Sequence, residues 1–255
     1  MKICLHPAYG FLESELRRIM KEGYSPDKVF CNNRNVVEKV TLAGKPYVIK
    51  KFKRPTLANC FIYTFFRKSK AQRAYENAML LLEMGIKTPF PVAYIEVKKY
   101  GFFHTGYLVT EYVDYPLLSH LNVEEYTQEE LKKLSSSFIY FTISLQEKRI
   151  LPLDYNPGNI FYFYNKKNDC YDFALTDINR MRFGRVSWTR DTMRSFEQFG
   201  LSTEHLYDFM LKYSVERGVD LDFCMYQFLS FRLRKKVKRF LKNKLKLQIR
   251  RRELK

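Results

Sequence analysis

The sequence predicts an α+β fold of two lobes, in which a small antiparallel β-sheet with one main helix precedes a mostly helical lobe. Two observations favour this fold class: short β-rich runs dominate the first part of the chain, and helical periodicity dominates the second. The length of 255 residues suits one large domain or two small lobes. We place the lobes at residues 1–113 and 114–255, with a hinge near Glu111.

The first lobe is expected to begin with a helix over residues 11–22, where apolar residues recur at helical spacing before Gly23. Ala43-Gly44-Lys45 joins two β-rich runs and is typical of a hairpin turn. A further helix is expected over residues 69–84, since alanines line one side of it and Gly85 follows it. The expected strands cover residues 28–31, 35–42, 46–52, 92–98 and 106–113.

The second lobe is expected to open with a long helix over residues 126–148, followed by a loop that contains proline and glycine. Residues 160–164 and 171–176 indicate a hairpin around a polar turn. From Arg190 onward the pattern is helical, with breaks near residues 200–202 and at Gly218.

Composition excludes several protein classes. Hydrophobic residues make up 46% of the chain and aromatic residues 16%, which argues against disorder. The five cysteines are widely spaced and form no C-x-x-C pair, so a disulfide framework or a zinc site is not expected. The sequence has no signal-peptide pattern and no apolar run of the ~18 residues that a membrane span needs. We therefore expect a cytoplasmic protein with reduced cysteines.

Charge is concentrated at the C-terminus. The chain has a net charge of +18, of which residues 231–255 carry +12, through thirteen basic residues and one acidic residue. In this tail, apolar residues fall on one face of a predicted helix, and they include Val237, Phe240, Leu241, Leu245 and Ile249.

Two interpretations fit this basic helix. Its apolar stripe can pack on the second lobe, or the helix can lie on an anionic membrane surface, where each basic residue contributes ~1 kcal/mol. Nucleic acid is a less favoured partner, because no nucleic-acid-binding module accompanies the basic residues.

The pattern most informative about chemistry is Leu153-Asp154-Tyr155-Asn156-Pro157-Gly158-Asn159, followed by Asp177 after a hydrophobic run. An aspartate and an asparagine five residues apart, with a second aspartate behind them, is the arrangement that protein-kinase-like enzymes use for phosphoryl transfer. Asp154 is the candidate base for the acceptor hydroxyl. Asn159 and Asp177 are candidate magnesium ligands, since Mg²⁺ prefers oxygen donors.

The first lobe supplies candidates for binding the nucleotide. Lys50 lies on the third β-rich run, where its ammonium group is expected to neutralise the α- and β-phosphates of ATP, and Glu76 in the following helix is expected to hold Lys50 by an ion pair. Taken singly, each residue is as well explained as an ordinary solvent-exposed charge. The order of lysine, glutamate, aspartate, asparagine and aspartate along the chain gives the hypothesis its weight.

With these motifs the chain resembles the bacterial lipopolysaccharide core kinases, the Kdo and heptose kinase family with a protein-kinase-like fold. The resemblance covers most of the chain and rests on residues 48–52, 67–78, 88–91, 154–161 and 177–184. It implies phosphorylation of a sugar hydroxyl of the lipopolysaccharide inner core with ATP and Mg²⁺. By this resemblance Asp154 is the catalytic base, Asn159 and Asp177 are metal ligands, and Lys50 with Glu76 binds phosphate.

The chain departs from the family and kinase patterns in three places. Cys31-Asn32-Asn33-Arg34-Asn35 replaces a glycine-rich phosphate loop, so Arg34 or backbone amides are expected to bind phosphate instead. Pro152-Leu153 stands where protein kinases have His-Arg. Asp177-Ile178-Asn179-Arg180 offers one carboxylate fewer than Asp-x-Asp-Arg. We add Arg34 and Glu111, at the predicted hinge, to the candidate nucleotide-binding residues.

Charge also bears on the acceptor. A kinase of cationic sugars is expected to have an acidic acceptor pocket, whereas this basic chain suits an anionic, lipid-anchored glycan at the inner face of the cytoplasmic membrane. Two alternatives stay open. One is a pseudokinase that acts as a membrane-associated binding or scaffold protein, and the other is a kinase of a different substrate.

Overall fold

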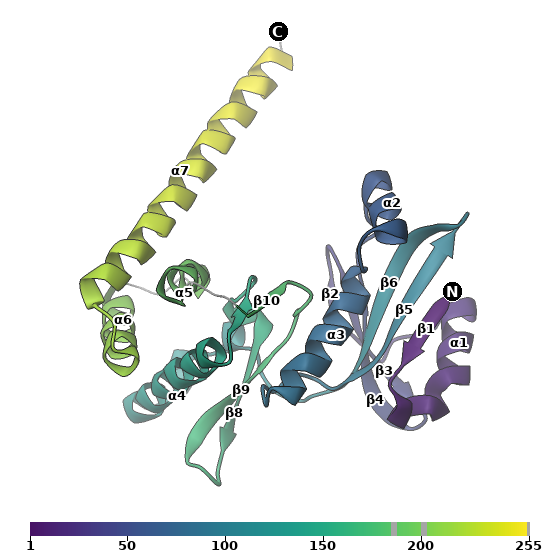
Figure 1. The fold of residues 1–255 in the computed structure, drawn as a ribbon, viewed down its shortest axis with the longest axis horizontal. Coiled ribbons are helices and arrows are strands. Elements are labelled where there is room, and N and C mark those ends of the chain that lie inside the picture. The colour runs from purple at the N-terminus through teal and green to yellow at the C-terminus, as the bar shows by residue number, and fades with distance from the viewer. Residues whose placement is uncertain (185–187, 200–202, 254–255) are drawn as a thin grey trace. The chain divides into compact units, whose positions relative to one another are not determined.

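The structure is a computed structural model that describes residues 1–184, 188–199 and 203–253 (Figure 1). The chain forms two compact units. The first unit comprises Met1–Pro116 together with Phe173–Met181, and the second comprises Leu117–Asp172 together with Arg182–Lys255. A segment from late in the sequence therefore completes the first unit.

The first unit contains a six-stranded antiparallel sheet with strand order β1-β5-β6-β4-β3-β2. Its strands are β1 (Lys2–Leu5), β2 (Lys28–Asn32), β3 (Val36–Leu42), β4 (Lys45–Lys51), β5 (Pro91–Lys99) and β6 (Phe102–Glu111). Its helices are η1 (Pro7–Leu12), α1 (Glu13–Glu22), α2 (Leu57–Phe65) and α3 (Lys70–Glu83). Strand β1 and helix α2 were not predicted from the sequence.

Tight turns set the register of this sheet. Ala43 and Gly44 connect β3 to β4, and both have positive φ, at 46° and 75°. Tyr100 and Gly101 connect β5 to β6 in the same way, with φ of 51° and 80°. Two successive left-handed residues match the right-handed twist of a hairpin, which explains why Gly occupies the second place in each turn.

Side-chain alternation along β4 decides which face of the sheet Lys50 occupies. Tyr47 and Ile49 are buried in a core with Leu12 and Leu16 of the η1–α1 segment. Lys50 points to the opposite face, because alternate residues of a strand point to opposite sides. There it lies opposite Leu108, which belongs to a second core beneath α3.

Small residues let α3 approach this face closely. Ala71, Ala74 and Ala78 are fully buried along one side of the helix. A Cβ atom placed on Gly106 of β6 would lie 3.0 Å from the Cβ of Ala71. Helix α3 therefore packs directly over β5 and β6, the latter being the neighbour of the strand that holds Lys50. Ser69 caps the helix by accepting a hydrogen bond from the Gln72 amide (3.1 Å).

The second unit is mostly helical. Its helices are η2 (Leu118–His120), η3 (Val123–Glu125), α4 (Gln128–Glu147), η4 (Pro157–Asn159), α5 (Trp188–Phe196), η5 (Glu197–Phe199), α6 (Thr203–Arg217) and α7 (Leu221–Glu253). Short strands form two two-stranded sheets, β7 (Ile150–Pro152) with β10 (Met181–Phe183) and β8 (Ile160–Asn165) with β9 (Cys170–Leu175). The predicted break at Gly218 separates α6 from α7, and the predicted break at residues 200–202 lies outside the described residues.

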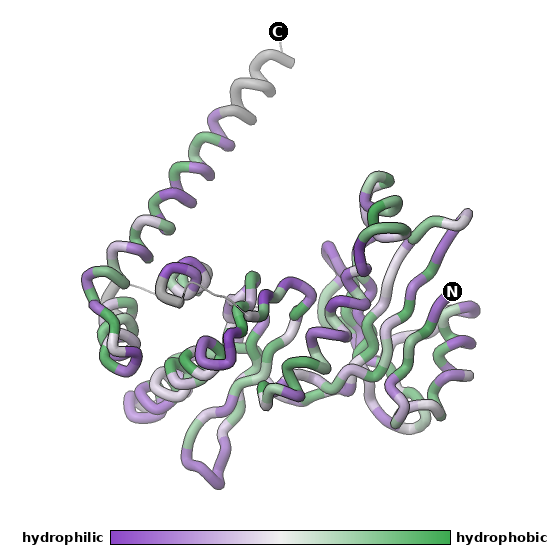
Figure 2. Tube along the Cα trace, viewed as in Figure 1, coloured by the Kyte–Doolittle hydropathy of each residue, from purple (hydrophilic) through white to green (hydrophobic). Residues whose placement is uncertain are grey.

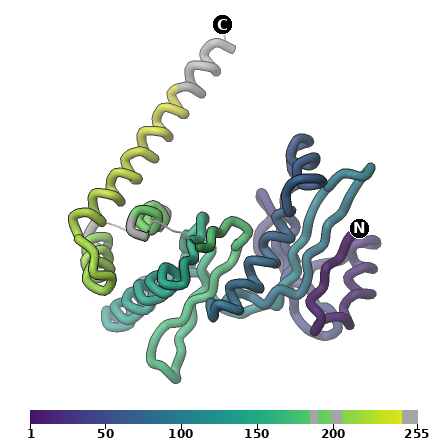
Figure 3. The backbone as a smooth tube through the Cα atoms, viewed as in Figure 1, coloured from purple at the N-terminus to yellow at the C-terminus, as the bar shows by residue number. Residues whose placement is uncertain are grey.

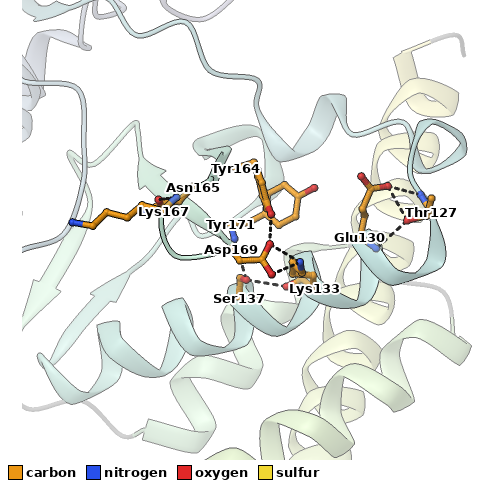
Figure 4. Close-up of polar contacts among 9 residues, drawn as sticks. All are labelled: Thr127, Glu130, Lys133, Ser137, Tyr164, Asn165, Lys167, Asp169 and Tyr171. Carbon is orange, nitrogen blue, oxygen red and sulfur yellow. Dashed lines mark hydrogen bonds and ion pairs between the residues drawn. The ribbon is translucent and has the colours of Figure 1, made fainter.

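Polar contacts fix the start of α4 and the β8–β9 turn beside it (Figure 4). Thr127 and Glu130 form a reciprocal capping box, in which the Glu130 carboxylate accepts from the Thr127 backbone N–H and the Thr127 hydroxyl accepts from that of Glu130. One turn later, Lys133 Nζ lies 2.7 Å from Asp169 in the turn. The Ser137 hydroxyl accepts from the Tyr171 amide (3.2 Å).

Helix α7 begins in the core of the second unit and continues beyond it. Cys224 and Phe228 are fully buried, whereas every residue from 233 to 244 is exposed. Figure 3 traces the helix toward the C-terminus. Val237, Phe240 and Leu241 of the predicted apolar stripe are exposed rather than packed, and the side chains of Leu245 and Ile249 lie outside the described residues. Among the described residues, none of the helices has the length and apolar character of a membrane span.

Candidate active site

An ion pair joins two of the predicted site residues in the first unit. Lys50 Nζ lies 2.6 Å from Asp177 Oδ1, and the lysine side chain is only 14% exposed. Asn179 Nδ2 donates to the same aspartate oxygen at 2.7 Å. The sheet thus presents a largely desolvated cation directly against the carboxylate that the sequence suggested as the main magnesium ligand.

The segment that carries Asp177 is anchored by hydrogen bonds within the first unit. Asn77 of α3 donates to the Ile178 carbonyl (2.7 Å), and the Thr88 hydroxyl donates to the Leu175 carbonyl (2.7 Å). The Leu175 amide donates to the Lys87 carbonyl (2.9 Å). These contacts hold Asp177 in a left-handed backbone conformation, with φ of 52°, which non-glycine residues adopt infrequently.

A group of cations lies around Lys70, which itself lies near Asp177. Burial lowers the pKa of Lys70, in the first turn of α3, and the nearby guanidinium groups of Arg34, Arg73 and Arg180 lower the pKa further, while Asp177 raises it. Burial is also the main cause that lowers the pKa of Arg73. Like charges near one another disfavour the charged form of Lys70, and an anion with several oxygens would be complementary to this group.

Arg34 reaches this group from the turn that replaces a glycine-rich loop. The turn lies between β2 and β3, and the Asn35 side-chain oxygen accepts a hydrogen bond from the Lys53 amide just beyond β4 (3.1 Å). Arg34 acts electrostatically on Lys70, and its role in place of the missing glycines stays a prediction. Lys70, Arg73 and Arg180 were missed, although Lys70 at the start of a predicted helix was a usable signal.

The predicted ion pair between Lys50 and Glu76 is wrong for this structure. Glu76 instead pairs with Lys68 (2.8 Å) and accepts a hydrogen bond from Gln72 Nε2 (3.0 Å). The physical reason is local competition. Gln72 lies one helical turn before Glu76, Lys68 precedes the same helix, and Asp177 already neutralises Lys50.

Glu111, at the end of β6, has a structural partner. The Tyr9 hydroxyl donates to Glu111 Oε1 at 2.5 Å, and the Glu111 amide donates to the Phe90 carbonyl at 2.9 Å. Burial is the largest cause that raises the pKa of Tyr9, followed by this hydrogen bond. The side chain of Glu111 thus ties the 3-10 helix η1 to the end of the sheet, and its role in nucleotide binding stays a prediction.

Asp154 and Asn159 belong to one hydrogen-bonded loop in the second unit. The Asp154 backbone carbonyl accepts from Asn159 Nδ2 (2.8 Å) and from Asn156 Nδ2 (3.0 Å). Because Asn159 donates through its nitrogen, its side-chain oxygen is the end that is left to bind a cation. The Gly158 amide donates to Asn156 Oδ1 (3.0 Å), and a Cβ on Gly158 would crowd that oxygen at 3.2 Å.

A buried tyrosine fixes this loop to helix α4. Tyr155 is 3% exposed, its hydroxyl lies 2.9 Å from that of Thr142, and its ring stacks on Phe138 with a centroid distance of 5.8 Å. Burial raises the pKa of Tyr155. The packing of Tyr155 thereby positions the neighbouring Asp154, a task for which protein kinases use a His-Arg pair just before the aspartate.

The donor types suit magnesium. Asp177 offers a carboxylate and Asn159 an amide oxygen, both of which are hard oxygen ligands. Across the described residues there is no cluster of three His, Cys, Asp or Glu side chains that would form a metal site from protein alone. Asp177 belongs to the first unit and Asn159 to the second, and their joint role as magnesium ligands stays a prediction.

No family model and no curated protein matches the sequence. A solved structure, WaaP in complex with acyl carrier protein, matches with a TM-score of 0.59 at 16% sequence identity, over 93% of this chain and 99% of that one. This likeness confirms the predicted α+β fold class. The chain therefore has the two-lobed, protein-kinase-like fold of WaaP.

Proposed function

We propose that the protein is an ATP- and magnesium-dependent kinase that phosphorylates a sugar hydroxyl, on Kdo or heptose, of the lipopolysaccharide inner core. The observation that carries the proposal is the Lys50–Asp177 ion pair beside Lys70, Arg34 and Arg180. A cation on a strand, held against a carboxylate, is what phosphoryl transfer requires for the nucleotide phosphates and their metal. WaaP shares the fold, and the lipopolysaccharide core kinases are the family that the sequence resembles.

Each candidate site residue would have its own role in the reaction. Asp177 and Asn159 would hold magnesium, which would neutralise charge on the transferring phosphoryl group. Lys50 would exchange its pairing with Asp177 for phosphate oxygens, and Lys70 with Arg34 would bind the same anion. Asp154 would accept the proton of the sugar hydroxyl and orient it for attack.

The proposed acceptor and location follow from charge. A net charge of +18 favours an anionic glycan over a cationic one, and the exposed basic part of α7 favours an anionic lipid surface. We therefore place the protein in the cytoplasm, at the inner face of the cytoplasmic membrane. The structure of WaaP contains acyl carrier protein, and a partner of that kind is a further candidate for this chain.

The direct test is mass spectrometry of core glycolipid incubated with the protein, ATP and Mg²⁺. We expect the gain of one phosphate with the parent chain, and a loss of at least a hundredfold in rate for Asp154→Asn and for Asp177→Asn. Asp169→Asn is the matched control, because Asp169 is an exposed aspartate in the β8–β9 turn, and it should keep the parental rate.

Two results would overturn the proposal. If Asp154→Asn and Asp177→Asn phosphorylate as fast as the parent, the site is misassigned. If ATP with Mg²⁺ fails to raise the melting temperature of the parent at saturating concentration, the chain is a pseudokinase rather than a kinase.

A further inference from the structure

Helix α2, its C-cap and the start of β6 carry an exposed apolar cluster, which we call the α2 patch: Leu57, Phe61, Phe65, Phe66 and Phe102. Phe65 is 61% exposed and Phe66 is 76% exposed. The rings touch one another, with centroids of Phe61 and Phe65 5.0 Å apart and those of Phe65 and Phe102 6.1 Å apart. Figure 2 shows α2 as a predominantly hydrophobic helix beside the ends of β5 and β6. Contiguous exposed apolar side chains of this kind mark an interaction site.

The opposite side of α2 anchors the patch to the sheet. Cys60 is buried, Tyr63 packs edge-on against Phe103 at 5.5 Å, and the Thr64 hydroxyl accepts a hydrogen bond from the Phe103 amide (2.8 Å). Leu57, Phe61 and Phe65 are spaced four residues apart and so form one stripe on the remaining side. Helix α2 is therefore largely apolar on both sides, and one of its apolar stripes faces solvent.

Basic residues accompany the patch without acidic ones. Residues 50–75 contain eight lysines and arginines and no aspartate or glutamate, and residues 97–108 contain two lysines and no acidic residue. Lys51, Arg54 and Lys99 lie close enough to His104 to lower its pKa, after burial, which is the larger cause. An apolar stripe flanked by basic residues is complementary to a surface that has anionic groups on the outside and apolar groups beneath them.

We propose that the α2 patch inserts into the surface of an anionic phospholipid membrane, with Phe65 and Phe66 reaching the acyl-chain boundary. The neighbouring lysines and arginines contact the lipid phosphates. A lipid surface fits better than a protein partner, because a stable protein interface uses roughly 20–30 residues a side and the patch has five. Exposed aromatic side chains with basic residues in the adjoining segments are a composition that binds at a lipid–water interface.

This docking does not depend on the proposed kinase activity. It would bring the first unit to the surface in which a lipid-anchored acceptor resides, and it is separate from the basic part of α7. Vesicle binding needs neither ATP nor turnover, so an inactive protein can still confirm the docking, and an active one can still refute it.

The first experiment measures flotation of the full chain with vesicles of phosphatidylglycerol and phosphatidylethanolamine. We expect Phe65→Ser to lower the partition coefficient about tenfold. Phe11→Ser is a matched control, since Phe11 is a phenylalanine of the same unit with 60% exposure outside the patch, and it should bind as the parent does. Equal binding of the two variants would overturn the proposal.

The second experiment reads insertion at one position even if α7 also binds the vesicle. Tryptophan is placed at Phe65, or at Phe11 as control, in a Trp188→Phe background that removes the only native tryptophan. We expect Phe65→Trp alone to shift to shorter emission wavelength and to be quenched by lipids with brominated acyl chains.

Three outcomes of the second experiment would overturn the proposal. One is an unquenched tryptophan at position 65 in protein that floats with vesicles. Another is a shift that depends on protein concentration without lipid, which would assign the patch to a second copy of the chain. The last is a shift produced by an acidic protein and not by vesicles. If the Trp188→Phe background fails to fold, the flotation comparison still decides, because it retains Trp188.

Discussion

At the scale of single residues, two features of Asp177 can be tested separately. Its carboxylate pairs with Lys50, and its backbone has positive φ. Asparagine tolerates that conformation better than alanine does. We therefore expect Asp177→Asn and Asp177→Ala to lose phosphotransfer alike, but Asp177→Ala to unfold with about 1 kcal/mol less free energy than Asp177→Asn. Urea unfolding of the two variants measures the difference, and equal stability would show that the backbone conformation imposes no strain.

Lys70 is the residue through which the cationic group is best tested. Removing its charge with Lys70→Gln should weaken binding of ATP with Mg²⁺ about tenfold, measured by calorimetry. Lys68→Gln is the matched control two positions earlier, because Lys68 is exposed and pairs with Glu76, and it should leave nucleotide affinity unchanged. Equal losses in the two variants would mean that only net charge matters.

The lowered pKa of Lys70 gives this prediction a pH dependence. The folded protein releases the Lys70 proton at lower pH than the unfolded chain does, so this group increases the free energy of unfolding as pH rises through its lowered pKa toward 10.5. ATP affinity should follow the opposite course and fall over that range, because the neutral amine no longer attracts phosphate. Lys70→Gln should lack this part of the pH profile.

At the scale of elements, the capping box of α4 is predicted to carry stability in the second unit. Thr127→Ala removes the cap and should lower the free energy of unfolding by about 1 kcal/mol near neutral pH, measured by urea unfolding. Hydrogen bonds from Thr127 hold the pKa of Glu130 below its ordinary value. The stabilisation that the Glu130 carboxylate contributes is therefore present above its unfolded pKa and is lost as pH falls through its lowered pKa in the folded protein. The loss of unfolding free energy caused by Thr127→Ala should become smaller over that pH range. A pH-independent cost would contradict the reciprocal cap.

Elements with strong local signals were the ones that could be predicted from the sequence. The hairpin at Ala43-Gly44, helix α3 with its alanine face, and the long helix α4 all carry turn, cap or periodicity signals. Helix α2 was missed because its apolar stripe faces solvent, so that the run around residues 57–66 lacks the polar side that a surface helix normally shows. Strand β1 is four residues long and forms by pairing with β5. The local sequence pattern does not predict this pairing.

The candidate site shows the same difference between local and long-range information. Lys50, Asp177 and the Asp154–Asn159 loop were named from the sequence because their order and spacing along the chain match a kinase pattern, and their roles stay predictions. The partner of Glu76 was predicted wrongly, and the anchors Asn77 and Thr88 were missed, because these contacts depend on which side chains three-dimensional packing brings together. Which of several nearby polar side chains form a contact depends on the packed structure, and the local sequence does not show it.

At the scale of the whole molecule, charge is predicted to separate two modes of membrane attachment. Deleting residues 231–255 removes a net charge of +12 and should abolish most of the salt-sensitive binding to anionic vesicles, measured by flotation at increasing NaCl. The remaining binding should respond to Phe65→Ser and keep a weaker salt dependence, because apolar insertion is not screened whereas the lysines and arginines beside the α2 patch also contact lipid phosphates. Zwitterionic vesicles are the control. Salt sensitivity as large as that of the parent would contradict an electrostatic role for the tail.

The completion of the first unit by Phe173–Met181 has a consequence for synthesis of the chain. During translation, the sheet and α3 emerge from the ribosome well before the segment that neutralises Lys50 and satisfies Asn77 and Thr88. The unit can close only after residue 181 has left the exit tunnel. A fragment that stops at Pro116 would lack this segment, and pulse proteolysis of stalled nascent chains should show protection of the early sheet arising only at lengths beyond residue 181.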